Sequence, residues 1–362
     1  MTTITITDTA QDATTAFADR VMKATLAWMD LMSVHLGSQL GWYAALADAD
    51  GLTFGELAGR THTDPRYARE WLEQQAATGI LDVDGATDAA ARSFRLAPGV
   101  AEVLLDRAST AYLEPFARMA AASGTQLEAL IDAYRTGGGV SWEQLGAHAR
   151  EAQADLNRPW LQQVPALFAD VGRLDDVLRR PGARIADLGS GGGWSSISLA
   201  QAYPQLAVVG FDVDEASVEI ARRNAAEAGV ADRVEFLLCD AALVHEHGPF
   251  DAVFAFECLH DMPHPAQVLA AARRAVREGG PVVVMDEATE EHFSADAGEL
   301  ERLLYGFSLF VCLPDGLSHR PSAGTGTVMR PSTLRGYARE AGWSDVRILI
   351  PEFGTFRFYE FV

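Results

Sequence analysis

Residues 183–194 read Ala-Arg-Ile-Ala-Asp-Leu-Gly-Ser-Gly-Gly-Gly-Trp, an apolar segment followed at once by a run rich in glycine. The apolar part has the length and composition of a buried strand, and residues 194–202 have those of a helix. Glycine allows the backbone to turn tightly and to approach a ligand closely. The segment therefore predicts a strand, a ligand-binding loop and a helix in succession.

Strands and helices alternate on the C-terminal side of this loop. We expect strands at 183–188, 206–211, 234–239, 251–256 and 281–286, and helices at 194–202, 215–228 and 265–277. Such alternation predicts an α/β fold with a doubly wound, mostly parallel sheet. A helix at 331–342 precedes two last strands, at 345–350 and 355–361. Because no helix separates these two strands, we expect one of them to run antiparallel.

Acidic residues at the ends of the first three strands indicate the kind of ligand. The loop has the spacing Asp-x-Gly-x-Gly-x-Gly and begins with Asp187, which would repel a pyrophosphate but attract a cation. Asp212 ends the next strand, where a carboxylate can accept the hydroxyl groups of a ribose. Asp240 ends the third strand, where its carboxylate can accept a hydrogen bond from the exocyclic amine of an adenine. The backbone N–H of Ala241 can donate a hydrogen bond to the adenine ring. Ligands of open α/β sheets bind at these carboxyl ends.

With these motifs, residues 166–362 resemble the class I S-adenosylmethionine-dependent methyltransferases. The resemblance covers the glycine loop, the acids after the second and third strands, the fourth strand and the Gly279-Gly280 turn. It implies a Rossmann-like, seven-stranded sheet in the order 3-2-1-4-5-7-6 and S-adenosylmethionine as the cofactor. It also implies a cofactor site composed of Asp187, Gly189, Ser190, Gly191, Gly193, Asp212, Val213, Asp240, Ala241 and Glu257.

The fourth strand leads into residues 256–263, Phe-Glu-Cys-Leu-His-Asp-Met-Pro, which in this fold line the pocket beside the transferable methyl group. An unperturbed imidazole titrates near about pH 6.5, so His260 suits removal of a proton from a hydroxyl group. The segment resembles the Leu-His-Asp-Trp stretch of O-methyltransferases in which the histidine is the general base. That resemblance makes His260 the candidate base and Asp261 its partner. Met262 departs from the family pattern, so a pocket-lining or structural His260 is the alternative.

The N-terminal part carries a different pattern. We expect a tail at 1–15 and helices over 16–47, followed by a helix with a capping box at Thr53 and another that begins at Pro65. Two short strands come next, and helix, turn, helix, hairpin is the order of a winged helix. It resembles the dimerisation domain that precedes this fold in many small-molecule methyltransferases. The predicted domains are 1–105 (winged helix, for dimerisation), 106–175 (helical connector) and 176–362 (methyltransferase).

Composition and charge limit the partners. The 362 residues carry a formal net charge of −21, whereas binding to nucleic acid requires Lys and Arg to neutralise phosphates. The predicted wing at 82–88 is acidic, which is unsuited to contact with a DNA backbone. We therefore expect a homodimer formed through the N-terminal domain, without a nucleic-acid or membrane partner. The polar N-terminus predicts a cytoplasmic protein, and the scattered cysteines and histidines predict no metal site.

These patterns predict methyl transfer from S-adenosylmethionine to a small-molecule acceptor, with a hydroxyl group as the first choice and carbon or nitrogen left open. The alternatives are an enzyme of this fold that uses the cofactor for another reaction, and a transcriptional regulator that senses the cofactor. Two sets of side chains are further candidates for the pocket: His292, Tyr305, His319 and Arg330 on the acceptor side, and Arg158 and Trp160 beside the methionine carboxylate.

Overall fold

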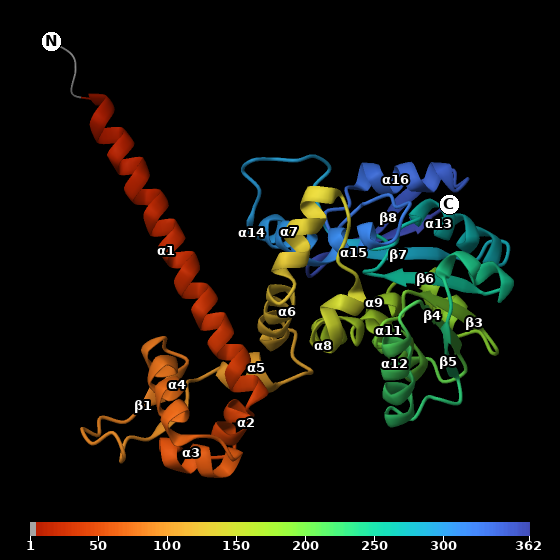
Figure 1. Ribbon diagram of the computed structural model, residues 1–362. Coiled ribbons are helices and arrows are strands. Elements are labelled where there is room, and N and C mark those ends of the chain that lie inside the picture. The colour runs from red at the N-terminus through yellow and green to blue at the C-terminus, as the bar shows by residue number, and fades with distance from the viewer. Residues whose placement is uncertain (1–4) are drawn as a thin grey trace. The chain divides into compact units, whose positions relative to one another are not determined.

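The computed structural model describes residues 5–362, with side chains from residue 12 onward. The chain divides into two compact units, residues 1–121 and 122–362, and the ribbon in Figure 1 shows the elements of each. The segment 106–175, expected to connect two domains, is shared between these units.

The first unit is mainly helical. Its elements are α1 (Thr5–Gln39), α2 (Trp42–Ala47), α3 (Phe54–Thr61), α4 (Pro65–Ala77), β1 (Leu81–Val83), β2 (Phe94–Leu96), α5 (Val100–Leu105) and the start of α6 (Glu114–Gly124). The predicted tail is wrong from residue 5 onward, because residues 5–15 continue α1 as regular helix; residues 1–4 lie outside the described residues.

The elements from α3 to β2 follow the predicted winged-helix order. Thr53 and Glu56 form the expected capping box at α3. Asp64 caps α4 by accepting hydrogen bonds from the backbone of Arg66 and Tyr67, with proline at the first helical position. β1 and β2 pair antiparallel as a hairpin. Local capping signals in the sequence therefore fix where both helices begin.

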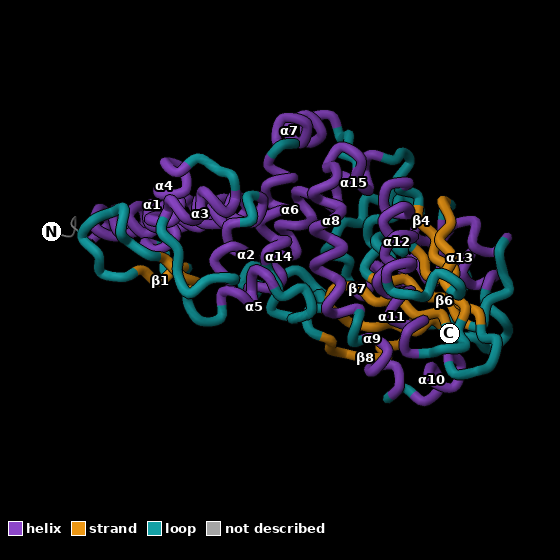
Figure 2. Tube along the Cα trace, turned by 90° about the horizontal axis from the view of Figure 1, so that it is seen from below, coloured by secondary structure: helices purple, strands orange, loops and turns teal. Residues whose placement is uncertain are grey.

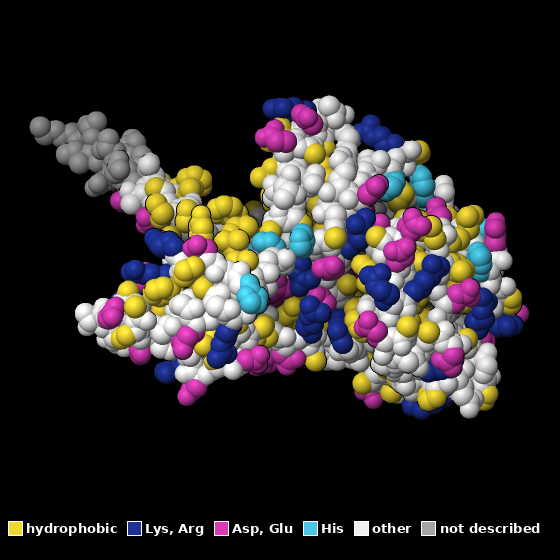
Figure 3. All heavy atoms as spheres, turned by 60° about the horizontal axis from the view of Figure 1, so that its bottom comes forward, with side chains coloured by type: hydrophobic (Ala, Val, Ile, Leu, Met, Phe, Trp, Pro, Cys, Tyr) yellow, Lys and Arg dark blue, Asp and Glu magenta, His cyan; other side chains and the backbone are white. Residues whose placement is uncertain are grey.

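The helix α1 exposes a large apolar surface. Figure 3 shows hydrophobic side chains gathered along its described part. The large apolar side chains of α1 that are at least half exposed are Phe17, Val21, Met22, Leu26, Trp28, Met29 and Leu36. A contiguous apolar surface of this kind is typical of a protein–protein contact.

The second unit contains the seven-stranded sheet. Its order is β5-β4-β3-β6-β7-β9-β8, which is 3-2-1-4-5-7-6 when the strands of this unit are numbered along the chain, as predicted. The strands are β3 (Arg184–Leu188), β4 (Ala207–Asp212), β5 (Val234–Leu238), β6 (Ala252–Phe256), β7 (Val282–Glu287), β8 (Val346–Phe353) and β9 (Phe356–Phe361). Only β9 runs antiparallel to its neighbours, so the expected antiparallel strand of the closing hairpin is the last one.

Helices cover both faces of this sheet (Figure 2). The helices of this unit are α7 (Leu127–Thr136), α8 (Trp142–Leu161), α9 (Val164–Ala169), α10 (Gly172–Leu178), α11 (Trp194–Ala202), α12 (Glu215–Glu227), η1 (Ala241–Glu246), α13 (Pro265–Ala275), α14 (Glu299–Phe307), the π-helix η2 (Ser308–Cys312), α15 (Leu313–Ser318) and α16 (Pro331–Glu340). Among the described residues, no helix is both long and apolar enough to cross a membrane.

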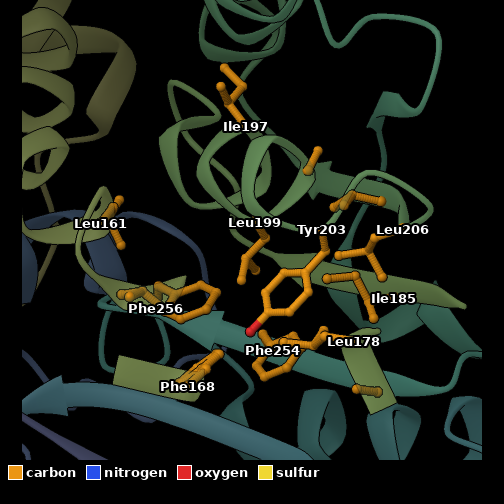
Figure 4. Packing of buried hydrophobic residues seen from close by; sticks show 14 of the residues in the cluster. Leu161, Phe168, Leu178, Ile185, Ile197, Leu199, Tyr203, Leu206, Phe254 and Phe256 are labelled. Carbon is orange, nitrogen blue, oxygen red and sulfur yellow. The ribbon is translucent and has the colours of Figure 1, made fainter. Parts of the chain in front are cut away.

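Alternate side chains of the strands enter two separate cores. Ile185 and Phe254 pack with Phe168 on one face, as Figure 4 shows, whereas Ala186 and Val253 belong to the core of the other face. Each fully buried aromatic or aliphatic side chain stabilises the fold by about 1.5–3 kcal/mol. The sheet is thus a rigid base, and the loops at the carboxyl ends of its strands are held in place.

Candidate active site

The glycine loop between β3 and α11 has a backbone path that glycine alone adopts readily. Gly189, Gly191 and Gly193 have φ angles of 63°, 50° and 82°. A Cβ atom on Gly193 would lie 2.6 Å from the ring of Phe236, so this glycine also allows close packing. A Cβ atom on Gly191 would meet no atom within 4 Å, so open space lies beside the middle of the loop.

Asp187 supports this loop from within the protein. Its side chain is 1% exposed, and Oδ2 accepts hydrogen bonds from the hydroxyl groups of Ser195 (2.6 Å) and Ser196 (2.5 Å) in α11. Burial raises the pKa of Asp187 to about 6. These hydrogen bonds join the end of β3 to the start of α11. Oδ1 of Asp187 is buried and has no hydrogen-bond partner among the described residues, and the attraction of this carboxylate for a cationic ligand stays a prediction.

Asp212 links the end of β4 to the glycine loop. Its Oδ2 accepts a hydrogen bond from the backbone of Gly191 (2.8 Å), and its Oδ1 accepts one from Asp214 (2.9 Å). Burial raises the pKa of Asp212 although these N–H groups oppose the shift. Val213, the next residue, is apolar and exposed. A carboxylate and an exposed apolar side chain thus adjoin the open side of Gly191.

The end of β5 lies next to Asp212. The backbone N–H of Cys239 donates to the carbonyl oxygen of Asp212 at 2.8 Å. Asp240 is exposed and caps η1 by accepting a hydrogen bond from Ala242, while Ala241 is buried. Leu238 is apolar and exposed. The glycine loop, Asp212 and Asp240 therefore follow three neighbouring parallel strands, β3, β4 and β5, at one edge of the sheet.

Glu257 occupies a strained position directly after β6. Its φ of 51° lies in the left-handed region, which is uncommon for residues other than glycine and is often found at functional sites. Its carboxylate accepts hydrogen bonds from the side-chain amides of Gln153 (2.9 and 3.0 Å) and Asn157, both in α8. Burial raises the pKa of Glu257 to about 7.

The helix α8 also places Arg158 and Trp160, the two candidates for a carboxylate site. The Arg158 guanidinium lies 3.9 Å from the ring centroid of Trp194, the first residue of α11. Trp160 instead packs edge-on against Phe353 and Phe356. Of the two candidates, Arg158 is the one beside the glycine loop.

His260 is the centre of a buried polar cluster. Its imidazole is 1% exposed, and Nδ1 lies 2.9 Å from Oδ1 of Asp286 and 3.2 Å from Oε2 of Glu287. Its Nε2 lies 3.3 Å from Oδ1 of Asp261. The predicted pair His260–Asp261 is thus brought together, and two carboxylates from the end of β7 complete the set.

The charges in this cluster depend on one another. Burial by itself would lower the pKa of His260, but Asp261, Glu287 and Asp286 together raise it well above its ordinary value. Burial raises the pKa of Glu287 well above its usual range. The pKa of Asp286 is lowered, because the charge of His260 and its hydrogen bond outweigh burial. The favoured arrangement is a charged pair of His260 and Asp286 beside a protonated Glu287.

Two sets of side chains have the types and spacing of metal ligands, with atoms within 4.8 Å of one another. One is His260, Asp261 and Cys312, and the other is His260, Asp286 and Glu287. The sequence predicted no metal site because it could not show that these residues meet. Both sets use His260, so a metal ion in either would compete with a proton for one imidazole nitrogen.

The remaining candidates lie apart from His260. Arg330 forms an ion pair with Glu301 and donates to the hydroxyl of Tyr305 at 3.1 Å. His292 and His319 are exposed. The structure thus unites Arg330 and Tyr305 in a group of their own and brings neither exposed histidine into the buried cluster.

Sequence reasoning missed two parts of the site. Asp286 and Glu287 were visible as an acidic pair at the end of a predicted strand, and that position alone could have marked them. Gln153 and Asn157 lie four residues apart in a helix, which places their side chains on one face. No signal in the sequence paired that face with Glu257, which is 100 residues away from Asn157.

Comparison with known proteins identifies the family. Residues 179–311 match the family model described as a methyltransferase domain. The chain is 32% identical over 178 residues to a "Ubiquinone biosynthesis O-methyltransferase" of Burkholderia pseudomallei, an alignment that covers 48% of this chain and 70% of the relative. The chain belongs to the S-adenosylmethionine-dependent methyltransferases. Its cofactor is S-adenosylmethionine.

Other relatives of this methyltransferase agree with the assignment. It is 34% identical over 174 residues to "27-O-demethylrifamycin SV methyltransferase" of Amycolatopsis mediterranei, covering 46% of this chain and 64% of the relative. The fold matches that of "Mitomycin 7-O-methyltransferase MmcR" with a TM-score of 0.72 at 22% identity, over 97% of this chain and 99% of the other. Human N-acetylserotonin methyltransferase, solved in complex with its methyl donor, matches with a TM-score of 0.64 at 17% identity, over 95% and 97%.

The residues of the methyltransferase site fit this cofactor. S-Adenosylmethionine carries a sulfonium, an ammonium, a carboxylate and an adenosine, and it has no phosphate. The open side of Gly191 leaves room for a ligand, and the carboxylates of Asp212 and Glu257 are acceptors of the kind that hydroxyl and ammonium groups require. The Nε atom of Arg158 is buried without a hydrogen-bond partner among the described residues, so a cation is available for the carboxylate.

Proposed function

We propose that this methyltransferase transfers the methyl group of S-adenosylmethionine to a hydroxyl group of a small molecule, with His260 as the general base. The observation that carries the proposal is the position of His260, which is held at Nδ1 by Asp286 and faces Asp261 at Nε2. The cofactor is proposed to bind through Asp212, Val213, Asp240, Ala241, Glu257 and the loop residues Gly189, Ser190, Gly191 and Gly193, with Asp187 supporting the loop.

The carboxylates prepare His260 for proton transfer. When bound, S-adenosylmethionine supplies a methyl group on a good leaving group, so alignment with the acceptor provides much of the rate. Asp286 accepts the Nδ1 proton and thereby leaves Nε2 as the nitrogen that removes the proton of the acceptor hydroxyl. Asp261, 3.3 Å from Nε2, stabilises the positive charge that forms on the ring. The raised pKa makes the neutral imidazole a strong base, and the ring has to release the proton of the charged pair before it can act.

Relatives support a hydroxyl acceptor. The names of the ubiquinone-biosynthesis and rifamycin relatives describe O-methylation or a demethylated oxygen. A histidine paired with a carboxylate is suited to the removal of a hydroxyl proton. We therefore infer that the acceptor is a phenol or a polyketide-like alcohol.

The base can be tested with His260→Asn and a matched control, His264→Asn, which lies in the same loop and has no described side-chain partner. Methyl transfer from radiolabelled S-adenosylmethionine to a panel of phenols and polyketide alcohols should fall about 10²–10⁴-fold in the first variant and stay unchanged in the second. S-Adenosylhomocysteine affinity, measured by calorimetry, should persist in both. A full rate with His260→Asn would refute the role of base.

A chelator distinguishes a base from a metal ligand. If His260 is the base, prolonged treatment with EDTA leaves the rate of the wild-type enzyme unchanged. Loss of activity that zinc or magnesium restores would instead make His260 a ligand in one of the two sets that contain it.

We also infer that the enzyme is a homodimer formed through its N-terminal unit. The exposed apolar side chains of α1 run over more than five helical turns, from Phe17 to Leu36. Burial of such a surface against a second copy would remove it from water, which is the main favourable term in association.

A further inference from the structure

We propose that η2 and α15 form a lid over His260, and that the segment leading into α8 is a latch that holds this lid shut by binding Asp315. We call residues 308–318 the lid and residues 139–142 the latch. The inference rests on the proposed role of His260, because the lid lies against that residue. It extends this role to a conformational device that controls when the methyl acceptor reaches the base.

The inner side of the lid lies on the loop that carries His260. The Sγ atom of Cys312, a nitrogen of His260 and a carboxylate oxygen of Asp261 all lie within 4.8 Å of one another. A Cβ atom on Gly316 would lie 3.2 Å from the carbonyl oxygen of Asp261, so α15 approaches this loop closely. An acceptor that comes to His260 from the side of Asp261 therefore has to displace the lid.

The outer side of the lid is bound by the latch through two backbone donors. The N–H of Val140 donates to the carbonyl oxygen of Pro314 at 3.0 Å. The N–H of Trp142 donates to Oδ1 of Asp315 at 2.7 Å. Because Trp142 is the first residue of α8, its N–H has no acceptor within the helix. The Asp315 side chain supplies that acceptor from the lid.

A glycine allows the latch to reach the lid. A Cβ atom on Gly139 would lie 2.2 Å from both the carbonyl oxygen of Pro314 and the backbone nitrogen of Ser318, and no side chain fits in that space. Nearby, the hydroxyl of Tyr134 in α7 donates to the carbonyl oxygen of Leu309 at 3.0 Å. The lid is thus held from outside along both η2 and α15.

The lid depends on these contacts because its helices are short. η2 has five residues and α15 has six. Isolated helices of fewer than about 12–15 residues are marginal in water. Packing on the inner and outer sides therefore decides whether the lid stays in place, and loss of the outer contacts shifts the equilibrium toward an open lid.

Gly146 separates the latch from the part of α8 that contacts the cofactor site. Its φ of 80° and ψ of −170° interrupt the helix in a region that only glycine adopts readily. Beyond it, Arg150 pairs with Asp214, and Gln153 donates to the carboxylate of Glu257. Because the helix is broken between these two parts, the latch can release the lid while the contacts at the cofactor site persist.

The test measures opening of the lid in the full chain. Hydrogen exchange followed by mass spectrometry reports the backbone of residues 308–318, and labelling of Cys312 by N-ethylmaleimide reports access to the covered side of His260. Asp315→Ala removes the acceptor of the Trp142 N–H. Both rates should rise at least about tenfold, since they follow the opening equilibrium and an acidic hydrogen-bond acceptor contributes that much.

A conservative variant identifies the interaction. Burial raises the pKa of Asp315 to about 7, so a full negative charge is not needed for the hydrogen bond. Asp315→Asn keeps a carbonyl acceptor and should therefore show rates near those of the wild type. Gly139→Ala should open the lid from the latch side, and it carries the test if Asp315→Ala does not fold.

Matched controls separate opening of the lid from general loosening. Asp296→Ala and Gly124→Ala make the same chemical changes at exposed positions of this unit and should alter neither rate. Cys239, which follows β5, should be labelled equally in all variants. S-Adenosylhomocysteine affinity, measured by calorimetry, should also stay at the wild-type value in Asp315→Ala and Gly139→Ala.

Three results would overturn the latch: wild-type rates in both opening variants, faster exchange throughout the sheet, or a parallel loss of S-adenosylhomocysteine affinity. None of these readouts is methyl transfer. The latch can therefore fail while His260 is the base, and a full rate with His260→Asn would refute the base while the latch stands.

Discussion

Replacement of Gly192 by alanine tests the contact between α8 and the glycine loop. The added methyl group would lie 2.8 Å from Cβ of Ala154, closer than two such atoms pack, while its other neighbours, Asn224 and Trp194, are at 3.8 Å. The φ angle of Gly192 is not positive, so the alanine adds no backbone strain. Relief therefore requires α8 to move away from the loop.

The expected cost follows from this single contact. Overpacking of one methyl group costs about 1–3 kcal/mol, and for a unit of this size 1 kcal/mol lowers the melting temperature by about 2–4 °C. Movement of α8 also displaces Arg158 and the amides on Glu257, so affinity for S-adenosylhomocysteine should fall at least about tenfold. Thermal melting and calorimetric titration measure the two effects.

A double-mutant cycle with Ala154→Gly shows whether the contact with Ala154 causes the losses of stability and affinity in Gly192→Ala. Ala154→Gly alone costs about 1 kcal/mol through helix propensity, but it removes the atom that the new methyl group meets. The double variant should therefore be more stable than the sum of the single changes by about 1–2 kcal/mol, and its ligand affinity should recover. Additive losses, or a harmless Gly192→Ala, would show that α8 does not rest on the loop.

Three further predictions concern other parts of the enzyme. Asp286→Asn removes one of the carboxylates that keep the pKa of His260 high against the opposing effect of burial. Because the base acts in its neutral form, kcat/KM should begin to rise at lower pH than in the wild type; an unmoved pH profile would contradict the pairing. Asp212→Asn should weaken S-adenosylhomocysteine binding by about 1–3 kcal/mol, and equal affinity in a titration would remove Asp212 from the site. Trp28→Glu should convert the proposed dimer to monomers in sedimentation experiments, and a persistent dimer would place the interface away from α1.

The sheet and its glycine loop could be predicted because their signals are local. Apolar strands, the glycines of residues 189–193 and the acidic residues at the strand ends predicted the strands and the loop, and the resemblance that these motifs carry implied the strand order that the structure has. The caps of α3 and α4 were equally visible, since Thr53 and Asp64 bond within their own turns. Such features depend on residues a few positions apart.

The direction of side chains could not be predicted in the same way. Oδ2 of Asp187 accepts hydrogen bonds from two serines of α11, and the sequence did not indicate this pairing. The partners of His260 come from a neighbouring strand, and those of Glu257 from a helix before the sheet. Pairings of this kind form only when the chain is folded, and no regular spacing of residues in the sequence indicates them.

The nearly complete burial of His260 has a consequence for the timing of the reaction. Because the His260 side chain is only 1% exposed, its Nε2 atom cannot contact the hydroxyl group of the methyl acceptor until a neighbouring side chain moves aside. Asp286 and Glu287 belong to the rigid sheet, but Cys312, within 4.8 Å on the Asp261 side, ends a π-helix, a helix form that often marks functional sites. If residues 308–312 have to move before Nε2 meets the acceptor, the rate of that movement limits turnover, and a higher solvent viscosity would then slow the enzyme.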